Sequence, residues 1–205
     1  MMKIKGLPKK YLLVWEEAQK KFKEGREGDE QHAAETVQLV LKYSEEKDWD
    51  LDVLIPTAMM HDIGHAAILP EHMKYVTGAE KLPNGKLVHM LTGAKIAKEI
   101  LEKIGYDEDK TAEIVDIISV HDMDRVKGAD NDEMYDTDNK KIFHDLDALD
   151  RYTKKRLKSA MHHYPDKNLQ EMVTMVEKYL DLIFKDEIRE IAKERIRKLR
   201  EEAEK

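Results

Sequence analysis

The feature that most restricts how this chain can fold is the recurrence of histidine on the apolar faces of separate predicted helices. His32 shares a helical face with Val37 and Val40. His89 lies on an Ile- and Ala-rich face, and His121 ends a stripe of isoleucines. One such histidine is commonly a core residue bonded to the backbone. Several of them, in a chain with nine histidines, indicate instead that the side chains meet.

A fourth helical segment, Met59-Met60-His61-Asp62-Ile63-Gly64-His65, contains three metal-capable side chains. On a continuous helix His61 and His65 share one face, and Asp62 lies beside them. Zinc proteases use a related His-Glu-x-x-His motif, but Asp62 is about one methylene shorter than that glutamate. Gly64 is also a poor residue for a helix interior. This disfavours a protease, although the stretch alone is also compatible with histidines bonded to the backbone.

A fifth segment, from about Asn139, adds a carboxylate. Asp147 lies between Leu146 and Leu149, so it borders an apolar face, whereas Asp145 is equally compatible with solvent. Helical bundles build metal centres from imidazoles and carboxylates on facing helices. A shared metal site therefore explains His32, the His61–His65 stretch, His89, His121 and Asp147 together.

The rest of the pattern predicts an all-α protein. Apolar periodicity predicts helices over about residues 12–24, 31–46, 52–67, 87–104, 107–121, from 139 onward, and over 152–163, 168–184 and 186–205. Two loops, over about 69–86 and 123–138, separate some of them, and loops of this length are commonly functional. We predict a single-domain helical bundle over 1–205, with a core over about 29–152 and a C-terminal helical extension over 153–205.

Composition excludes several classes of function. The chain has no cysteine, so disulfides, thiolate nucleophiles and Cys-based metal sites are absent, and a metal must be held by His and carboxylates. A net charge of −7 disfavours nucleic-acid binding. No apolar run is long enough to span a bilayer, and no signal-peptide pattern opens the chain. We therefore expect a cytoplasmic protein that binds neither nucleic acid nor membrane.

Two regions leave alternatives open. The Asp-rich stretch 123–138 could hold calcium, but it lacks the spacing of a twelve-residue calcium loop, which favours a solvated acidic loop. The last helix has an apolar stripe that fits either packing on its own body or a partner helix, as in a homodimer.

The ordered series His32, His61-Asp62, Asp147 resembles the HD-domain superfamily of metal-dependent phosphohydrolases, over about residues 29–152. His89 and His121 are similar to the additional ligands of members with two metal ions. The resemblance implies a bundle of the HD-domain type that holds one or two divalent transition-metal ions, drawn from Fe, Mn, Zn or Co. It implies that Asp62 bridges the ions, that His32, His61 and Asp147 hold one, and that His89 and His121 hold the other.

The resemblance also implies an activity. We expect hydrolysis of a nucleotide or other small phosphate ester by a metal-activated water, with Asp62 and His65 as catalytic residues. His65 would protonate the leaving oxygen, bond a phosphate oxygen, or orient the site. Lys74, Arg125 and Arg151 are candidate phosphate-binding residues. The Gly-Tyr-Pro signature of cyclic-di-nucleotide phosphodiesterases is missing, since Met123 to Val126 stand in its place.

Two other functions remain open at this point. Proteins similar to myo-inositol oxygenase use nearly the same ligands for a mixed-valent di-iron centre that reacts with oxygen. A regulatory domain whose metal only joins the helices would also carry these residues.

Overall fold

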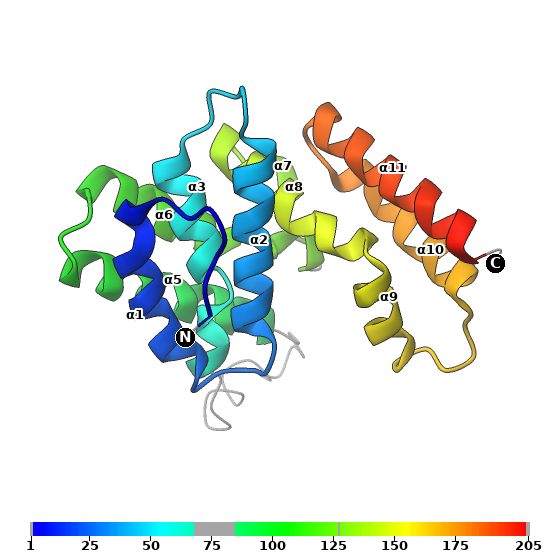
Figure 1. The fold of residues 1–205 in the computed structure, drawn as a ribbon, viewed down its shortest axis with the longest axis horizontal. Coiled ribbons are helices and arrows are strands. Elements are labelled where there is room, and N and C mark those ends of the chain that lie inside the picture. The colour runs from blue at the N-terminus through cyan, green and yellow to red at the C-terminus, as the bar shows by residue number, and fades with distance from the viewer. Residues whose placement is uncertain (1, 68–84, 127, 204–205) are drawn as a thin grey trace. The chain divides into compact units, whose positions relative to one another are not determined.

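The computed structural model describes residues 2–67, 85–126 and 128–203 (Figure 1). These residues fall into two compact units, Met1–Phe143 and His144–Lys205, which are described separately. A single domain over 1–205 therefore stays a prediction. Every regular element in the described ranges is helical, which confirms the all-α prediction. Within these ranges, no helix combines the length and apolarity that crossing a membrane requires.

The described part of the first unit is built of helices. In chain order they are η1 (Lys9–Tyr11), α1 (Leu12–Phe22), α2 (Asp29–Tyr43), α3 (Leu51–Met60), η2 (Ile63–Ala67), α5 (Gly85–Lys103), α6 (Glu108–Val120), η3 (Met123–Arg125), α7 (Asn131–Met134) and the start of α8 (Asp138–Ala148). Asp107 caps α6, because its side chain accepts a hydrogen bond from the Lys110 amide.

Helix α3 forms the centre of this unit. All its side chains from Val53 to Met60 are buried, so it is apolar on every side, as a helix enclosed by others must be. It packs against α1, α2 and α6, while α5 packs against α6 and η2 (Figure 1). The C-terminal end of α3 therefore lies inside the unit, and the residues that follow it are surrounded by other helices.

The predicted helix over 52–67 is shorter in the structure. Helix α3 ends at Met60, a turn follows at His61 and Asp62, and the chain continues as the 3-10 helix η2. The cause is a close approach between backbones. A Cβ on Gly64 would overlap the carbonyl oxygen of His89 and lie 2.5 Å from the amide nitrogen of Gly93. Only glycine lets η2 lie directly on α5 at this point.

The two predicted loops have different outcomes. The stretch 123–138 is not a plain loop, because η3 and the short helix α7 lie within it. Asp130 caps α7 through the amides of Asp132 and Glu133. Most of the predicted loop over 69–86 lies outside the described residues, and α5 begins at Gly85.

The second unit contains the end of α8, η4 (Leu149–Tyr152), α9 (Lys154–Met161), α10 (Leu169–Glu177), η5 (Lys178–Leu182) and α11 (Asp186–Ala203). Thr153 caps α9, and Asn168 and Glu171 form a capping box on α10. The apolar stripe of α11 buries Ile188, Ala192 and Ile196, and this helix packs on α10. The stripe thus packs within its own unit, and a homodimer stays a prediction.

Asp145 anchors the start of α11 within this unit. Its carboxylate has no exposed surface and accepts hydrogen bonds from the backbone amides of Phe184, at 3.0 Å, and Lys185, at 2.7 Å. The Nδ1 atom of His144 lies 2.9 Å from the same carboxylate. Asp145 is therefore a buried backbone partner, although its sequence position is equally compatible with solvent.

The contact at Gly64 generates the first prediction. Replacing Gly64 with alanine should separate η2 from α5 and lower the free energy of unfolding by about 1–3 kcal/mol, the usual range for overpacking. Denaturant unfolding measures the change. Gly25→Ala is the matched control, because a Cβ there would lie 3.4 Å from the Ala66 amide nitrogen, an ordinary contact. Equal stability of the two variants would contradict this account.

Candidate metal centre

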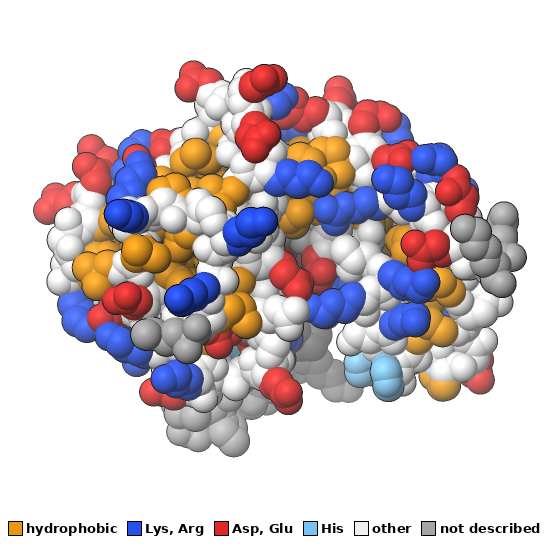
Figure 2. Space-filling model, in the orientation of Figure 1, with side chains coloured by type: hydrophobic (Ala, Val, Ile, Leu, Met, Phe, Trp, Pro, Cys, Tyr) orange, Lys and Arg blue, Asp and Glu red, His pale blue; other side chains and the backbone are white. Residues whose placement is uncertain are grey.

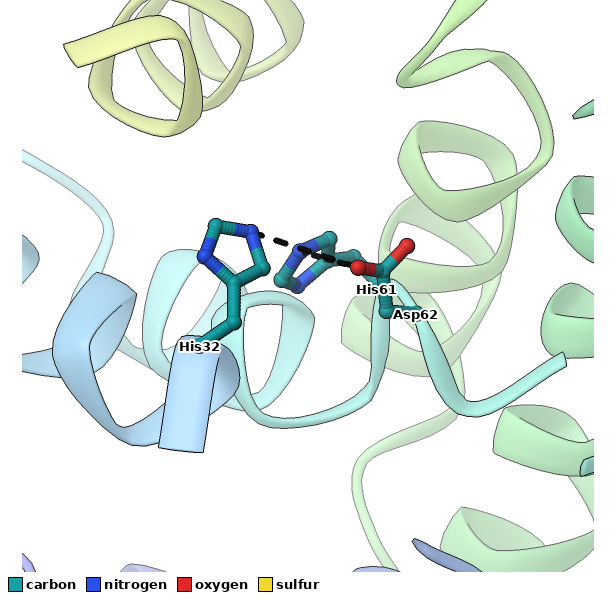
Figure 3. A group of neighbouring side chains, drawn as sticks. All are labelled: His32, His61 and Asp62. Carbon is teal, nitrogen blue, oxygen red and sulfur yellow. Dashed lines mark ion pairs between the residues drawn. The ribbon is translucent and has the colours of Figure 1, made fainter. Parts of the chain in front are cut away.

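Asp62 lies at the middle of a group of imidazoles. Its Oδ2 atom is 4.0 Å from Nε2 of His32 and 3.7 Å from Nε2 of His61. Its Oδ1 atom is 3.7 Å from Nε2 of His89 and 3.7 Å from Nε2 of His121. Figure 3 shows the His32 and His61 rings beside the Asp62 carboxylate. The four buried or half-buried rings of His32, His61, His89 and His121 are therefore divided two and two between the carboxylate oxygens, and His65 also faces Oδ1.

These distances fit metal ligands better than hydrogen bonds. They exceed the range of a good N–H···O bond, which ends near about 3.2 Å. Two ligand atoms at about 2.0–2.2 Å from one tetrahedral ion lie about 3.4 Å apart. The side chains form two groups that could hold an ion, His32-His61-Asp62 and Asp62-His89-His121, with ligand atoms within 4.8 Å of one another in each. Asp62 belongs to both.

Two of the histidines are oriented by the helices that they end. His61 and His121 are the C-cap residues of α3 and α6. The last carbonyls of a helix lack an amide partner within that helix. The His61 Nδ1 atom donates to the Ala58 carbonyl at 3.1 Å, and the His121 Nδ1 atom donates to the Ile118 carbonyl at 2.8 Å. With Nδ1 protonated, Nε2 carries the lone pair that a metal needs.

The site is buried on one side and accessible on the other. His61, His89 and His121 are at most 3% exposed, whereas the side chains of His32 and His65 are 23% and 17% exposed. His32 and His65 are therefore the most exposed histidines of the cluster.

His65 reaches the cluster although α3 does not continue to it. Its ring stacks on the ring of His89, with centroids 4.4 Å apart and planes 7° from parallel. Its Nε2 atom is 3.5 Å from Oδ1 of Asp62. The predicted proximity is thus present, but the 3-10 helix η2 provides it, and the catalytic role of His65 stays a prediction.

The charges of the cluster are strongly coupled. Burial alone would raise the pKa of Asp62, but His61, His121 and His65 outweigh it and hold that pKa well below its ordinary value. Burial, with the nearby His121, lowers the pKa of His89 to about 3. Burial would also lower the pKa of His121, but Asp62 and Asp122 raise it overall. The Nε2 atoms of His89 and His121 lie 3.2 Å apart, so a single proton can bond them.

The other predicted site residues lie in different places. Asp147 is a half-buried residue of α8 in the second unit, and its role as a ligand stays a prediction. Arg151 belongs to the same unit, with its guanidinium over the Tyr179 ring. Arg125 forms an ion pair with Asp122 at 3.2 Å. Lys74 lies outside the described residues.

Two residues beside the cluster, Arg26 and Asp29, are not among the predicted site residues. Arg26 lies in the turn before α2, and its Nη2 atom is 3.7 Å from Oδ2 of Asp62. Asp29, the first residue of α2, accepts hydrogen bonds from the same guanidinium. Burial raises the pKa of Asp29 in spite of the opposing effect of Arg26. The available signal was spacing, since Arg26, Asp29 and His32 follow one another at intervals of three.

Comparison with known proteins agrees with this geometry. The family model described as HD domain matches residues 30–152, a range that contains the whole ordered series from His32 to Asp147. No curated protein and no solved structure gave a significant match. The chain therefore belongs to the HD-domain family, whose members are typically metal-dependent phosphohydrolases.

Proposed function

We propose that this protein hydrolyses a nucleotide or other small phosphate ester with the help of two divalent metal ions. The observation that carries this proposal is the division of four imidazole nitrogens between the two oxygens of Asp62. A carboxylate that faces two nitrogen pairs is suited to bridge two ions. One ion would be held by His32 and His61, with Asp147 proposed as a further ligand, and the other by His89 and His121.

The donor set limits the metal without selecting one. Neutral imidazoles and carboxylates suit Fe, Mn, Zn or Co, and the chain has no thiolate that would favour a softer ion. When bound, such ions acidify water and neutralise charge on a phosphoryl group. The protein's contribution is to fix the ligand tautomers and to limit access of water to the cluster.

His65 is the proposed proton donor. Its ring is partly exposed, lies against the cluster, and stacks on the ring of His89. An imidazole in this position can donate to a leaving oxygen or to a phosphate oxygen. Arg125, Arg151 and Lys74 remain proposed phosphate-binding residues.

A small substrate fits the surface better than a polynucleotide. On the face shown in Figure 2, Asp and Glu side chains lie among the Lys and Arg side chains. Together with the net charge of −7, this offers no extended basic surface there for a phosphate backbone.

The decisive experiment combines metal analysis with a phosphate-release screen. We expect two transition ions per chain and phosphate release from at least one member of a panel of nucleotides and sugar phosphates. Oxygen consumption by an iron-loaded protein without phosphate release would identify a di-iron oxygenase instead. Bound metal with neither reaction would identify a regulatory domain, and no tightly bound metal after supplementation would overturn the proposal.

Replacing Asp62 with asparagine tests the bridging role. The amide keeps the shape of the side chain but loses the charge and one acceptor oxygen, so both ions should bind more weakly. Loss of residues that merely orient ligands costs about 10- to 100-fold in metal affinity or activity. We expect at least that loss of activity and reduced metal content. A variant that keeps full activity and changes only its melting temperature would refute the catalytic assignment.

The pKa shifts predict how metal binding depends on pH. His89, with a pKa of about 3, is already neutral at neutral pH, whereas Asp62 and Asp122 raise the pKa of His121, so His121 holds the more strongly bound proton of the pair. A metal must displace that proton, so affinity at the His89-His121 position should fall as pH falls through the pKa of His121. Calorimetry in buffers of different ionisation enthalpy should show that an ion binding at this position releases protons. Release of no proton would contradict the assignment.

A further inference from the structure

We infer that Arg26, oriented by Asp29, binds an oxygen of a terminal phosphate beside the metal centre, next to Oδ2 of Asp62. This inference rests on the proposed function. Arg26 lies between α1 and α2 and is not one of the imidazole residues. Among the described residues, its guanidinium is the nearest Arg or Lys group to Oδ2 of Asp62, with Nη2 at 3.7 Å from that oxygen. That oxygen is the one facing His32 and His61.

Asp29 fixes the orientation of the guanidinium. Its Oδ1 atom accepts from Nε of Arg26 at 2.8 Å and lies 2.6 Å from Nη2. Asp29 is only 2% exposed, and the backbone closes the same turn through a bond from the Asp29 amide to the Arg26 carbonyl, at 3.3 Å. Because the Asp29 carboxylate is buried and contacts two nitrogens of the guanidinium, it holds Arg26 more firmly than a solvated ion pair would.

The turn that carries Arg26 is also held against the site. Gly25 lies next to η2, because a Cβ on it would be in ordinary contact with the Ala66 backbone. Helix α1 contacts η2 as well, and η2 carries His65. The backbone next to Arg26 therefore packs on the same short helix that carries the proposed proton donor.

The remaining donors of Arg26 suit an anion. Nη1 forms no hydrogen bond or ion pair with any residue in the described ranges, and the side chain is 59% exposed. Metal ions at the cluster would repel a guanidinium that faces Asp62. An anion between them removes this repulsion, and Arg has the fork geometry that phosphate oxygens match.

The number of cationic groups indicates the class of phosphate. A terminal phosphate has three non-ester oxygens, whereas a phosphodiester has two. Two ions and one guanidinium offer three cationic partners, so Arg26 adds a contact that only a terminal phosphate can fully use. We therefore assign to this site a phosphomonoester or another ester that ends in a phosphate.

The experiment measures binding of inorganic phosphate and of dimethyl phosphate to the metal-loaded protein, by NMR titration or calorimetry, with metal content determined in parallel. Charge-assisted hydrogen bonds of this kind correspond to about a 10- to 100-fold change in affinity. Arg26→Gln should weaken the binding of inorganic phosphate by that factor. It should change the affinity for dimethyl phosphate by no more than about threefold and leave the metal content unchanged. Arg26→Lys should fall between wild type and Arg26→Gln. Asp29→Asn should weaken the binding of inorganic phosphate less than Arg26→Gln does, because the guanidinium is still present but is less firmly oriented.

Arg197→Gln is the matched control, because Arg197 has the same side-chain exposure of 59% and pairs with Glu194 on α11. It should bind both anions as the wild type does. Unchanged phosphate affinity in Arg26→Gln, equal weakening of both anions, or loss of metal would each overturn the inference while the proposed function stands. Failure of the metal-loaded wild type to bind phosphate or release it from any ester would overturn both.

Discussion

The buried carboxylate of Asp62, enclosed by imidazole rings, is the interaction on which the rest of the first unit depends. The Asp62 side chain is only 11% exposed, so its carboxylate loses most of its hydration, and that loss must be offset by nearby positive charge or hydrogen-bond donors. Protonated imidazoles can supply part of it, but an imidazole that binds a metal is neutral, and the bound cation would then supply the positive charge. The same geometry that makes Asp62 costly to bury therefore makes the cluster a strong candidate for metal binding.

The helix ends explain how the rings are held around this carboxylate. His61 and His121 each follow the last turn of a helix, where the carbonyl three residues earlier is available to accept from Nδ1. At the second of these ends the Asp122 amide donates to the Met90 sulfur, so the Ile118 carbonyl is left to His121. At each of these helix ends, a backbone carbonyl accepts from Nδ1 and so fixes the tautomer of the histidine. No additional side chain is needed.

The sequence predicted the parts of this arrangement that follow from periodicity. His32, His89 and His121 lie on apolar faces, and their helices were located with errors of only a few residues at each end. What periodicity could not reveal was the end of α3 at Met60, since that depends on the contact of Gly64 with α5. The pattern of residues within one segment does not indicate which distant backbone a glycine will contact.

Two other misses have the same cause. Arg26 lies in a turn with no periodic pattern, so only its contacts with Asp29 and Asp62 mark it as part of the site. Asp145 was equally compatible with solvent because its partners, the amides of Phe184 and Lys185, lie far along the chain. In each case the side chain gains its role from a tertiary contact, which the spacing of residues along one helix does not encode.

Family membership and substrate recognition have different physical origins in this protein. The imidazoles and Asp62 would make water reactive toward many phosphate esters, because a metal centre responds to the phosphoryl group and hardly to what is attached to it. Selectivity must come from groups outside the ligand set that contact the substrate. Arg26 is such a group, because Asp29 holds it at Oδ2 of Asp62 while part of its fork stays exposed. A charged residue on a turn can change between relatives without disturbing the helices that hold the ligands, so the same metal centre can serve different substrates.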